Sequence, residues 1–306
     1  MKPATAETPG ERGRVAPPTR RAVCRLLLPL PLAMGAVHRA GAQVPSRIIS
    51  LIPAVTEMLF AIGAGPQVIA VSSFDAFPPE ATKLPRVGAL IDPDLERILS
   101  LRPDLVVVYG TQDELRRQLD RAGIPQFVYR HARLADITDT MRALGRRVGR
   151  TEEGVRAASA LEGALQAVRE RVSGRRRPRT LLVFGREPGT LRSIFASGGF
   201  GFLHDMLEAA GGENVFADVP RESVQATSEL VLARRPEVIL EVKGGSPQDP
   251  ARTQKDVDAW GRLAAVPAVR AKRVHIITDD RVIVPGPRAA QGTELMARAL
   301  HPDAFA

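Results

Sequence analysis

Short apolar runs alternate with amphipathic segments along the first part of the chain. The runs over 48–52, 68–71, 105–109 and 127–129 are rich in branched or aromatic residues and predict buried strands. Between them, the segments over 57–62, 95–101 and 113–122 carry apolar residues at helical spacing, and a glycine or proline follows each within two residues. This alternation predicts a largely parallel α/β sheet.

From about residue 134 the pattern changes. Apolar residues such as Leu144, Val148, Leu161 and Leu165 recur at helical spacing, with no strand between them and an interruption near 149–151. A second α/β series opens with a strand over 180–184 and closes with a helix over 291–300. We therefore expect an N-terminal α/β lobe over 43–133, an interlobe backbone helix over 134–177 and a C-terminal α/β lobe over 178–306.

The first 42 residues predict an export signal. Arg20, Arg21 and Arg25 precede a short apolar run over 26–37, and small residues at 40–42 form a cleavage motif. The run is too short and too rich in proline to span a membrane. We expect cleavage near Ala42 and a periplasmic protein, with ordinary secretory and twin-arginine export both open.

The same segment accounts for the cysteine content and for much of the charge. Cys24 precedes the apolar run, so we predict no lipid anchor, and residues 43–306 contain no cysteine for a disulfide or a thiolate metal site. The formal charge of +9 falls to +4 without these 42 residues. The basic run over 175–177 follows a helix end, where cations oppose the helix dipole. We therefore expect no nucleic-acid partner.

Two parts of the chain repeat one pattern. The segment from Glu96 to 108 aligns with that from Glu229 to 241, and each glutamate is followed seven residues later by a proline. Asp94 and Thr227 stand two places earlier as helix caps. An upstream helix repeats as well, with 57–63 aligned on 205–211. Favourable interaction with the helix dipole would explain an acid at each position, but the paired occurrence suggests equivalent surface positions on two related lobes.

Several motifs follow one another in a fixed order along the chain: Ser50-Leu-Ile-Pro53-Ala-Val-Thr56-Glu57, Ser72-Ser-Phe74, Phe77-Pro-Pro-Glu80, Arg86-Val-Gly88, Leu95-Glu96-Arg-Ile-Leu-Ser-Leu-Arg-Pro103-Asp104, Gly211-Gly-Glu-Asn-Val215 and Pro287-Arg288. This ordered set resembles the periplasmic receptors of vitamin B12 and ferric-siderophore ABC importers, and within that family it is most similar to the vitamin B12 receptors. The resemblance implies a type III periplasmic binding protein, with two Rossmann-like three-layer α/β lobes joined by a long rigid interlobe helix. It implies a receptor that holds its ligand between the lobes, not an enzyme.

The resemblance also implies roles for individual residues. Glu96 and Glu229 match the glutamates that dock these receptors onto arginines of the membrane permease. The implied ligand-binding residues are Pro53, Phe74, Phe77, Tyr109, Asp280 and Arg281. Loop packing is an equal alternative for Phe74 and Phe77. We expect a monomer that needs no cofactor and no bound metal besides its ligand.

Two positions depart from the family pattern. Ser223 stands where the vitamin B12 receptor has a tryptophan, and Ala89 stands where some haem receptors have a tyrosine that binds iron. The second departure argues against haem held in that way. A corrinoid is the expected ligand, with a ferric siderophore or haem as the alternative.

Enzyme signatures are weak. His131, His204, His275 and His301 do not have metal-ligand spacing, and there is no G-x-S-x-G motif. The glycines at 198, 199 and 201 before a helix could cradle a phosphate, so a nucleotide-binding α/β enzyme is the remote alternative. Trp260 lies in an expected helix and is assigned to packing.

Overall fold

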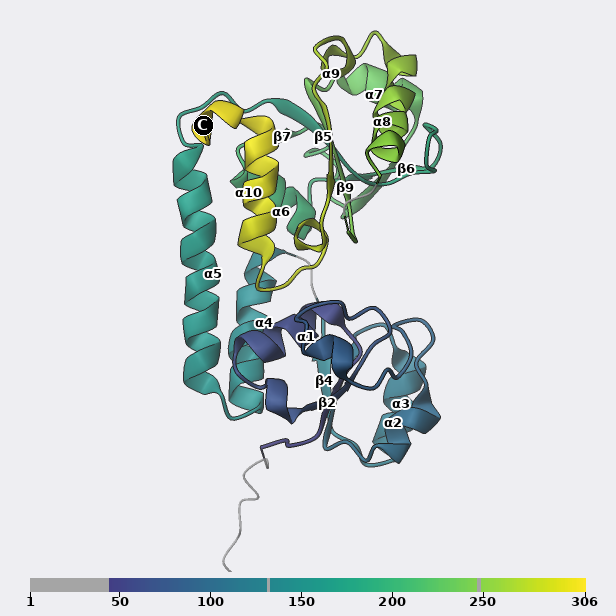
Figure 1. Ribbon diagram of the computed structural model, residues 1–306, viewed down its shortest axis with the longest axis vertical. Coiled ribbons are helices and arrows are strands. Elements are labelled where there is room, and N and C mark those ends of the chain that lie inside the picture. The colour runs from purple at the N-terminus through teal and green to yellow at the C-terminus, as the bar shows by residue number, and fades with distance from the viewer. Residues whose placement is uncertain (1–43, 131–132, 247–248) are drawn as a thin grey trace, which may run out of the picture. The chain divides into compact units, whose positions relative to one another are not determined.

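The computed structural model describes residues 44–130, 133–246 and 249–306 (Figure 1). The predicted signal peptide, with Cys24 and the cleavage site at Ala42, lies outside these residues, as does His131. Within the described residues, no helix combines the length and the apolar character that crossing a membrane requires.

The N-terminal lobe is built on a four-stranded parallel sheet in the order β2-β1-β3-β4. Its strands are β1 (Ile48–Ser50), β2 (Val68–Val71), β3 (Leu105–Tyr109) and β4 (Gln126–Tyr129). The connections contain helices α1 (Pro53–Ala61), α2 (Leu95–Ser100) and α3 (Asp113–Arg121) and the 3-10 turns η1 (Gly65–Gln67) and η2 (Ala81–Lys83). The central strands β1 and β3 are buried almost throughout. Burial on both faces explains why their sequences are almost entirely apolar.

The segment expected to be the interlobe helix forms two helices, α4 (Leu134–Arg147) and α5 (Thr151–Arg171). The chain reverses at Gly149, whose φ of 72° lies in the left-handed region. The helices pack closely because Gly145 and Gly154 face each other, and a Cβ built on Gly145 would lie 3.0 Å from the Gly154 Cα.

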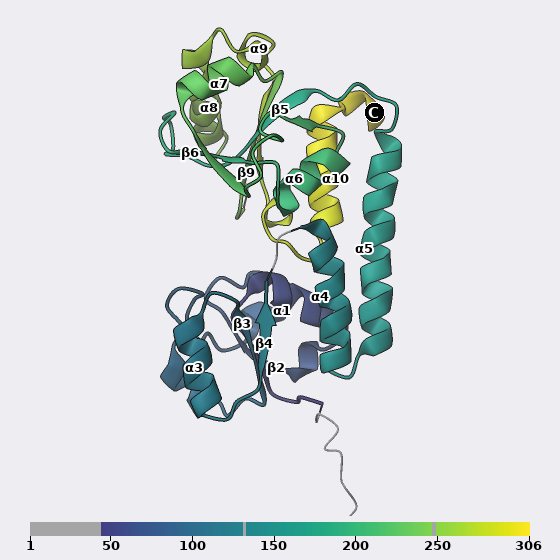
Figure 2. The same cartoon turned by 180° about the vertical axis from the view of Figure 1, so that it is seen from behind.

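Helix α5 has 21 residues and contacts helices from both parts of the chain. It lies alongside α4 and, further along, α10 (Figures 1 and 2). At 1.5 Å per residue its length is about 30 Å. The expected interlobe connection is thus this long helix, together with the shorter α4 packed against it.

The C-terminal lobe is built on a six-stranded sheet in the order β10-β9-β5-β6-β8, with β7 also beside β5. Its strands are β5 (Arg179–Gly185), β6 (Ile194–Ser197), β7 (Glu213–Asn214), β8 (Ser223–Ala226), β9 (Val238–Lys243) and β10 (Val274–Thr278). Its helices are α6 (Phe202–Ala209), α7 (Ser228–Arg234), α8 (Pro250–Ala259), α9 (Pro267–Arg270) and α10 (Ala289–Leu300), with 3-10 turns η3 (Trp260–Leu263), η4 (Asp280–Val282) and η5 (Pro302–Ala304).

The sheet topology repeats between the lobes. Strands β7, β5, β9 and β10 are neighbours in that order and all parallel, as β2, β1, β3 and β4 are in the first lobe. Helices α6 and α7 hold the places of α1 and α2. The antiparallel strands β6 and β8 are additions in the second lobe. The repeat found in the sequence is therefore a repeat of structure.

Most of the apolar core is one cluster that includes residues of both sheets and of α4 and α5. A second cluster in the C-terminal lobe surrounds Trp260, which is fully buried as expected. The Trp260 Nε1 donates a hydrogen bond of 3.3 Å to Glu241. Packing, with a polar anchor, is the role of this side chain.

Candidate functional site

Open α/β sheets bind ligands beyond the carboxyl ends of their parallel strands, so the strand ends of both lobes are candidate ligand-binding sites. In the N-terminal lobe, Pro53 opens α1 just after β1 and is half-buried. Tyr109 ends β3, and its ring meets that of Tyr129 at the end of β4 edge to face, with centroids 5.9 Å apart. Two tyrosines thus stand together at this edge of the sheet.

The loop after β2 exposes Phe74. The carboxylate of Asp75 accepts hydrogen bonds from the Ser72 N–H at 2.8 Å and the Ser72 hydroxyl at 2.5 Å, which closes a tight turn. Burial raises the pKa of Asp75 above its ordinary value. Phe74, inside this turn, is 71% exposed. Loop packing therefore does not account for Phe74.

Phe77 has a different setting from Phe74. The guanidinium carbon of Arg288 lies 3.9 Å from the centroid of its ring, within the range of a cation–π contact. The ring is still 38% exposed. One face of Phe77 is thus occupied by an arginine from the C-terminal lobe.

Asp280 and Arg281 lie in η4, directly after β10. The Asp280 carboxylate accepts a hydrogen bond of 2.7 Å from the Gly245 N–H. Arg281 donates through Nε and Nη2 to Asp279, at 2.8 and 2.5 Å. These bonds hold the pKa of Asp279 below its ordinary value. In the described part of the chain no protein acceptor engages Nη1 of Arg281.

The C-terminal lobe has an apolar pocket of about 410 Å³ beside the ends of β5 and β9. Its lining residues are Phe184, Phe200, Gly201, Phe202, Leu203, Glu222, Ser223, Gly244 and Ile283. The three phenylalanines were not predicted from the sequence. The pocket includes Ser223, the position at which the resemblance implies a tryptophan in the vitamin B12 receptor, and its aromatic surface comes from these phenylalanines.

The glycine cluster before α6 serves close packing of the backbone. A Cβ on Gly198 would lie 2.1 Å from the Arg221 carbonyl oxygen, and one on Gly199 would lie 2.1 Å from that of Ala217. The N–H groups of Gly198 and Gly199 already donate to the carbonyl oxygens of Glu222 and Val219, at 3.2 and 2.7 Å, so they are not free to bind a phosphate. The segment therefore does not form the phosphate cradle of the enzyme alternative.

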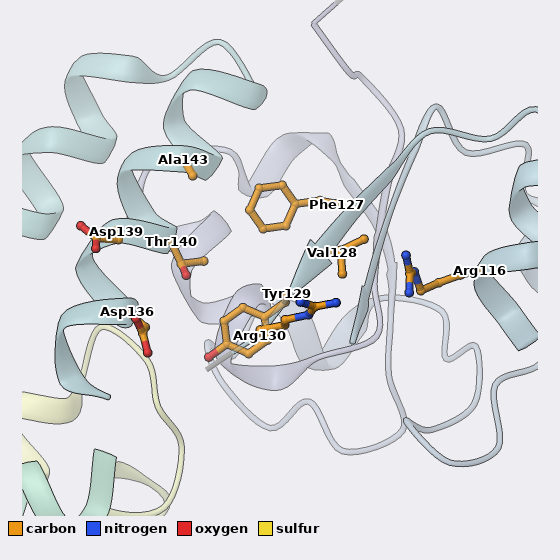
Figure 3. A pocket seen from close by; sticks show the side chains of 9 residues that line it. All are labelled: Arg116, Phe127, Val128, Tyr129, Arg130, Asp136, Asp139, Thr140 and Ala143. Atoms are coloured by element: carbon orange, nitrogen blue, oxygen red, sulfur yellow. The ribbon is translucent and has the colours of Figure 1, made fainter. Parts of the chain in front are cut away.

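A further pocket, of about 520 Å³, lies beside strand β4 and helix α4 (Figure 3). Its lining mixes cationic, acidic and apolar side chains, and it contains none of the predicted ligand residues. Arg116, on one side, is engaged with Asp113 at 3.0 Å. We do not assign the ligand to this pocket.

A buried ionic network supports the strand ends of the C-terminal lobe, and its members were not singled out in the sequence. Arg186 follows β5, is 1% exposed and contacts Glu241 of β9 at 2.9 Å. Lys243 bridges Glu241 and Asp256 of α8 at 2.9 and 2.6 Å. The network joins β5, β9 and α8 beside the apolar pocket.

Glu96 and Glu229 are both exposed, in the first turns of α2 and α7. The predicted caps are present, since Asp94 accepts from the Arg97 N–H at 2.9 Å and Thr227 from the Leu230 N–H at 3.2 Å. The backbone N–H of Glu229 and the Thr227 hydroxyl lower the pKa of Glu229. Neither glutamate forms an ion pair with another described residue. Both carboxylates are therefore available to a partner.

Two of the described histidines, His204 and His301, make local hydrogen bonds. His204 Nδ1 lies 3.2 Å from the amide of Asn214, and His301 Nε2 lies 3.1 Å from the Gly211 carbonyl oxygen. Among residues 44–130, 133–246 and 249–306, no group of three histidine, cysteine or acidic side chains could hold a metal ion.

Comparison with known proteins assigns the chain to a family. Residues 48–281 match the periplasmic binding protein family. The Vitamin B12-binding protein of Salmonella typhimurium is 35% identical over 251 residues, which cover 81% of this chain and 87% of the relative. That of Pectobacterium carotovorum is 34% identical over 271 residues, covering 86% and 92%.

Solved structures agree with this assignment. The periplasmic vitamin B12 binding protein BtuF of Vibrio cholerae has a TM-score of 0.72 at 27% identity, covering 86% of this chain and 98% of that one. The periplasmic heme-binding protein RhuT of Roseiflexus has a TM-score of 0.71 at 28% identity, covering 85% and 99%. These relatives are binding proteins, not enzymes. The chain belongs to the periplasmic binding protein family, and it is located in the periplasm.

Proposed function

We propose that this chain is the substrate-binding component of an ABC importer, and that it captures a corrinoid between its two lobes for delivery to a membrane permease. The observation that carries the proposal is the similarity to Vitamin B12-binding proteins, 35% identical over 81% of the chain. The aromatic side chains at the strand ends support it, because a corrin ring presents wide faces of low polarity.

The proposed site combines aromatic surface with a few directed polar groups. Phe74, Tyr109 and the exposed face of Phe77 would contact the ligand from the N-terminal lobe, with Pro53 beside them. The phenylalanine-lined pocket would receive an apolar part of the ligand. In the C-terminal lobe, Asp280 would accept hydrogen bonds from amide side chains of the ligand, and Arg281 would donate to them through Nη1.

The alternative is a ferric siderophore or haem. The likeness to the heme-binding RhuT, at 28% identity, favours keeping haem as the second candidate. Ala89 offers no phenolate at the position where some haem receptors supply an iron ligand, so haem would need another contact.

Calorimetric titration distinguishes the candidates. Purified protein is titrated in parallel with cyanocobalamin, haemin and a ferric hydroxamate siderophore, and we expect saturable heat at micromolar concentrations with cyanocobalamin. Phe74→Ala should weaken this binding. Phe305→Ala is the matched control, because Phe305 stacks on Arg171 at the end of α5. Saturable heat with haemin or the siderophore, and none with cyanocobalamin, would refute the corrinoid assignment.

We propose that Glu96 and Glu229 are the docking points for the permease. Each exposed ion pair contributes about 0–1 kcal/mol, but two fixed charges on one body also select orientation and speed association. The double variant Glu96→Lys/Glu229→Lys should lose binding to the corrinoid permease of the same organism, measured with the permease in nanodiscs. Its affinity for cyanocobalamin should not change.

The matched control for the docking variant lies in α5. Glu152 and Glu153 are acids in the first turn of that helix, as Glu96 and Glu229 are in theirs. Glu152→Lys/Glu153→Lys should retain permease binding. Loss of ligand affinity in the Glu96/Glu229 variant would contradict the docking role and place these residues in the ligand site.

We further propose the organisation of the exported chain. Residues 1–42 would be removed, so N-terminal sequencing of the exported protein should begin at Gln43. The lobes would span 43–133 and 178–306 with the helical connection between them, and sedimentation should give a monomer. A dimer by sedimentation would contradict the last point.

A further inference from the structure

Two ion pairs cross between the lobes. Arg288, at the start of α10, donates through Nε and Nη2 to the two oxygens of Glu57 in α1, at 2.8 and 2.5 Å. Arg133, at the start of α4, donates through Nε and Nη2 to Asp205 in α6, at 3.1 and 2.7 Å. Both pairs are bidentate, which fixes the relative orientation of the two side chains.

The two pairs are related by the internal repeat. Glu57 and Asp205 hold aligned positions on α1 and α6, the first helices of the two lobes. Arg133 and Arg288 are the N-cap residues of helices that follow β4 and β10, which are corresponding strands. Each lobe thus contributes an acid from its first helix, and the arginine comes from the segment that follows the last strand of the other lobe.

Both arginines also contact a phenylalanine ring. The guanidinium carbon of Arg288 is 3.9 Å from the centroid of Phe77, and that of Arg133 is 5.5 Å from the centroid of Phe200. Phe77 is a proposed ligand residue, and Phe200 lines the apolar pocket of the C-terminal lobe. The pairs therefore adjoin the proposed binding surfaces of both lobes.

We infer that the two pairs, Glu57–Arg288 and Asp205–Arg133, form a reciprocal clamp. Its four residues are positioning residues, which hold the two halves of the ligand site at one separation before the ligand binds. Arg288 lies seven residues after Arg281, and Glu57 lies four residues after Pro53. The clamp thus joins short segments that carry proposed ligand contacts on both lobes. The part of this inference that concerns affinity rests on the proposed function.

The two pairs are not equally buried, which ranks their effects. Glu57 and Arg288 have side-chain exposures of 3% and 18%, whereas Asp205 and Arg133 have 16% and 51%. Solvent screens an exposed pair, and a buried charge without its partner is costly. Gly286 leaves room beside the buried pair, since a Cβ there would lie 3.3 Å from a Glu57 oxygen. We therefore expect Glu57 to matter more than Asp205.

Pulsed electron paramagnetic resonance measures the separation directly. Residues 43–306 contain no cysteine, so spin labels are attached to cysteines introduced at the exposed positions Ser100 and Ala264, one on each lobe. Glu57→Gln should broaden or shift the distance distribution of the ligand-free protein, and Asp205→Asn should do so less. Asp218→Asn is the matched control, because Asp218 pairs bidentately with Arg234 inside the C-terminal lobe, at 2.9 and 2.9 Å.

Ligand affinity provides the second readout. If loss of the buried pair lowers the binding-competent population to about a tenth, cyanocobalamin affinity falls about tenfold. Arg288→Lys keeps the charge but loses the bidentate geometry, and it serves if Glu57→Gln does not fold. Unchanged distance distributions in the folded variants would overturn the clamp. The distance measurements need no ligand. If the wild type does not bind cobalamin, the proposed function is refuted, but the distance distributions still test the clamp.

Discussion

Replacement of Arg186 by methionine should destabilise the C-terminal lobe by several kcal/mol. Arg186 is 1% exposed and donates to Glu241 at 2.9 Å and to the carbonyl oxygens of Thr190 and Asp256, at 2.8 Å each. Methionine keeps much of the aliphatic bulk, so the change removes charge and hydrogen bonds with little loss of volume.

The magnitude follows from what the substitution leaves behind. Glu241 and Asp256, 1% and 3% exposed, would share the single cation Lys243. Removing one partner of a buried ionic group costs about 3–5 kcal/mol, because a buried charge is left uncompensated. For a protein of this size, each kcal/mol lowers Tm by about 2–4 °C, so we expect a loss of roughly 10 °C.

Thermal unfolding followed by circular dichroism tests this value. Arg234→Met is the matched control, because Arg234 pairs with Asp218 at 2.9 Å but their side chains are 29% and 61% exposed. An exposed pair contributes about 0–1 kcal/mol, so the control should stay within a few degrees of the wild type. An Arg186 variant as stable as the Arg234 variant would show that the network contributes no more than a surface pair.

Two other predictions concern close packing and pH. Gly292→Ala should lower stability by about 1–3 kcal/mol and weaken ligand binding, because a Cβ there would lie 2.0 Å from the Arg281 carbonyl oxygen. Gly163 is the control, since it also lies within a helix but a Cβ there would have no atom within 4 Å, so Gly163→Ala should be neutral or stabilising. Equal effects of the two substitutions in denaturant unfolding would contradict this reasoning. Burial lowers the pKa of His275 and His301 below the ordinary value of 6.5, so the unfolded state binds more protons and stability falls as pH drops through that value, by at most about 1.4 kcal/mol per pH unit for each group. Replacing both histidines by asparagine should flatten this slope between pH 7.5 and 5.5, and an unchanged slope would show that they do not cause it.

The parallel strands were predictable because their sequences carry a strong signal. Strands β1, β3 and β9 are buried almost throughout, so their sequences are mostly apolar; the exceptions are Ser50 in β1 and the paired Glu241 and Lys243 in β9. Strands β6 and β8 have four residues each, with exposed positions on both. In so short a strand, one exposed face leaves too few apolar residues for a periodic pattern, and neither strand was predicted.

The candidate site was predictable only where residues follow a strand or open a helix. Tyr109, Asp280 and Glu96 were proposed in this way or by resemblance. Phe184, from β5, meets Phe200 and Phe202, from just before and at the start of α6, in one pocket, and no spacing rule indicates that they do. Pairing of Glu57 with Arg288, 231 residues away, depends on how the lobes pack against each other.

Burial separates acids that the repeat makes look alike. Duplication provides two pairs of acids, one in α1 and α6 and the other in α2 and α7. Glu96 and Glu229 face solvent, so an arginine of another protein can reach them. Glu57 is buried, and an unpaired carboxylate there would be so costly that it requires a cation from the same chain. A charge-removing substitution should therefore alter permease docking at the second pair of positions and the arrangement of the lobes at the first.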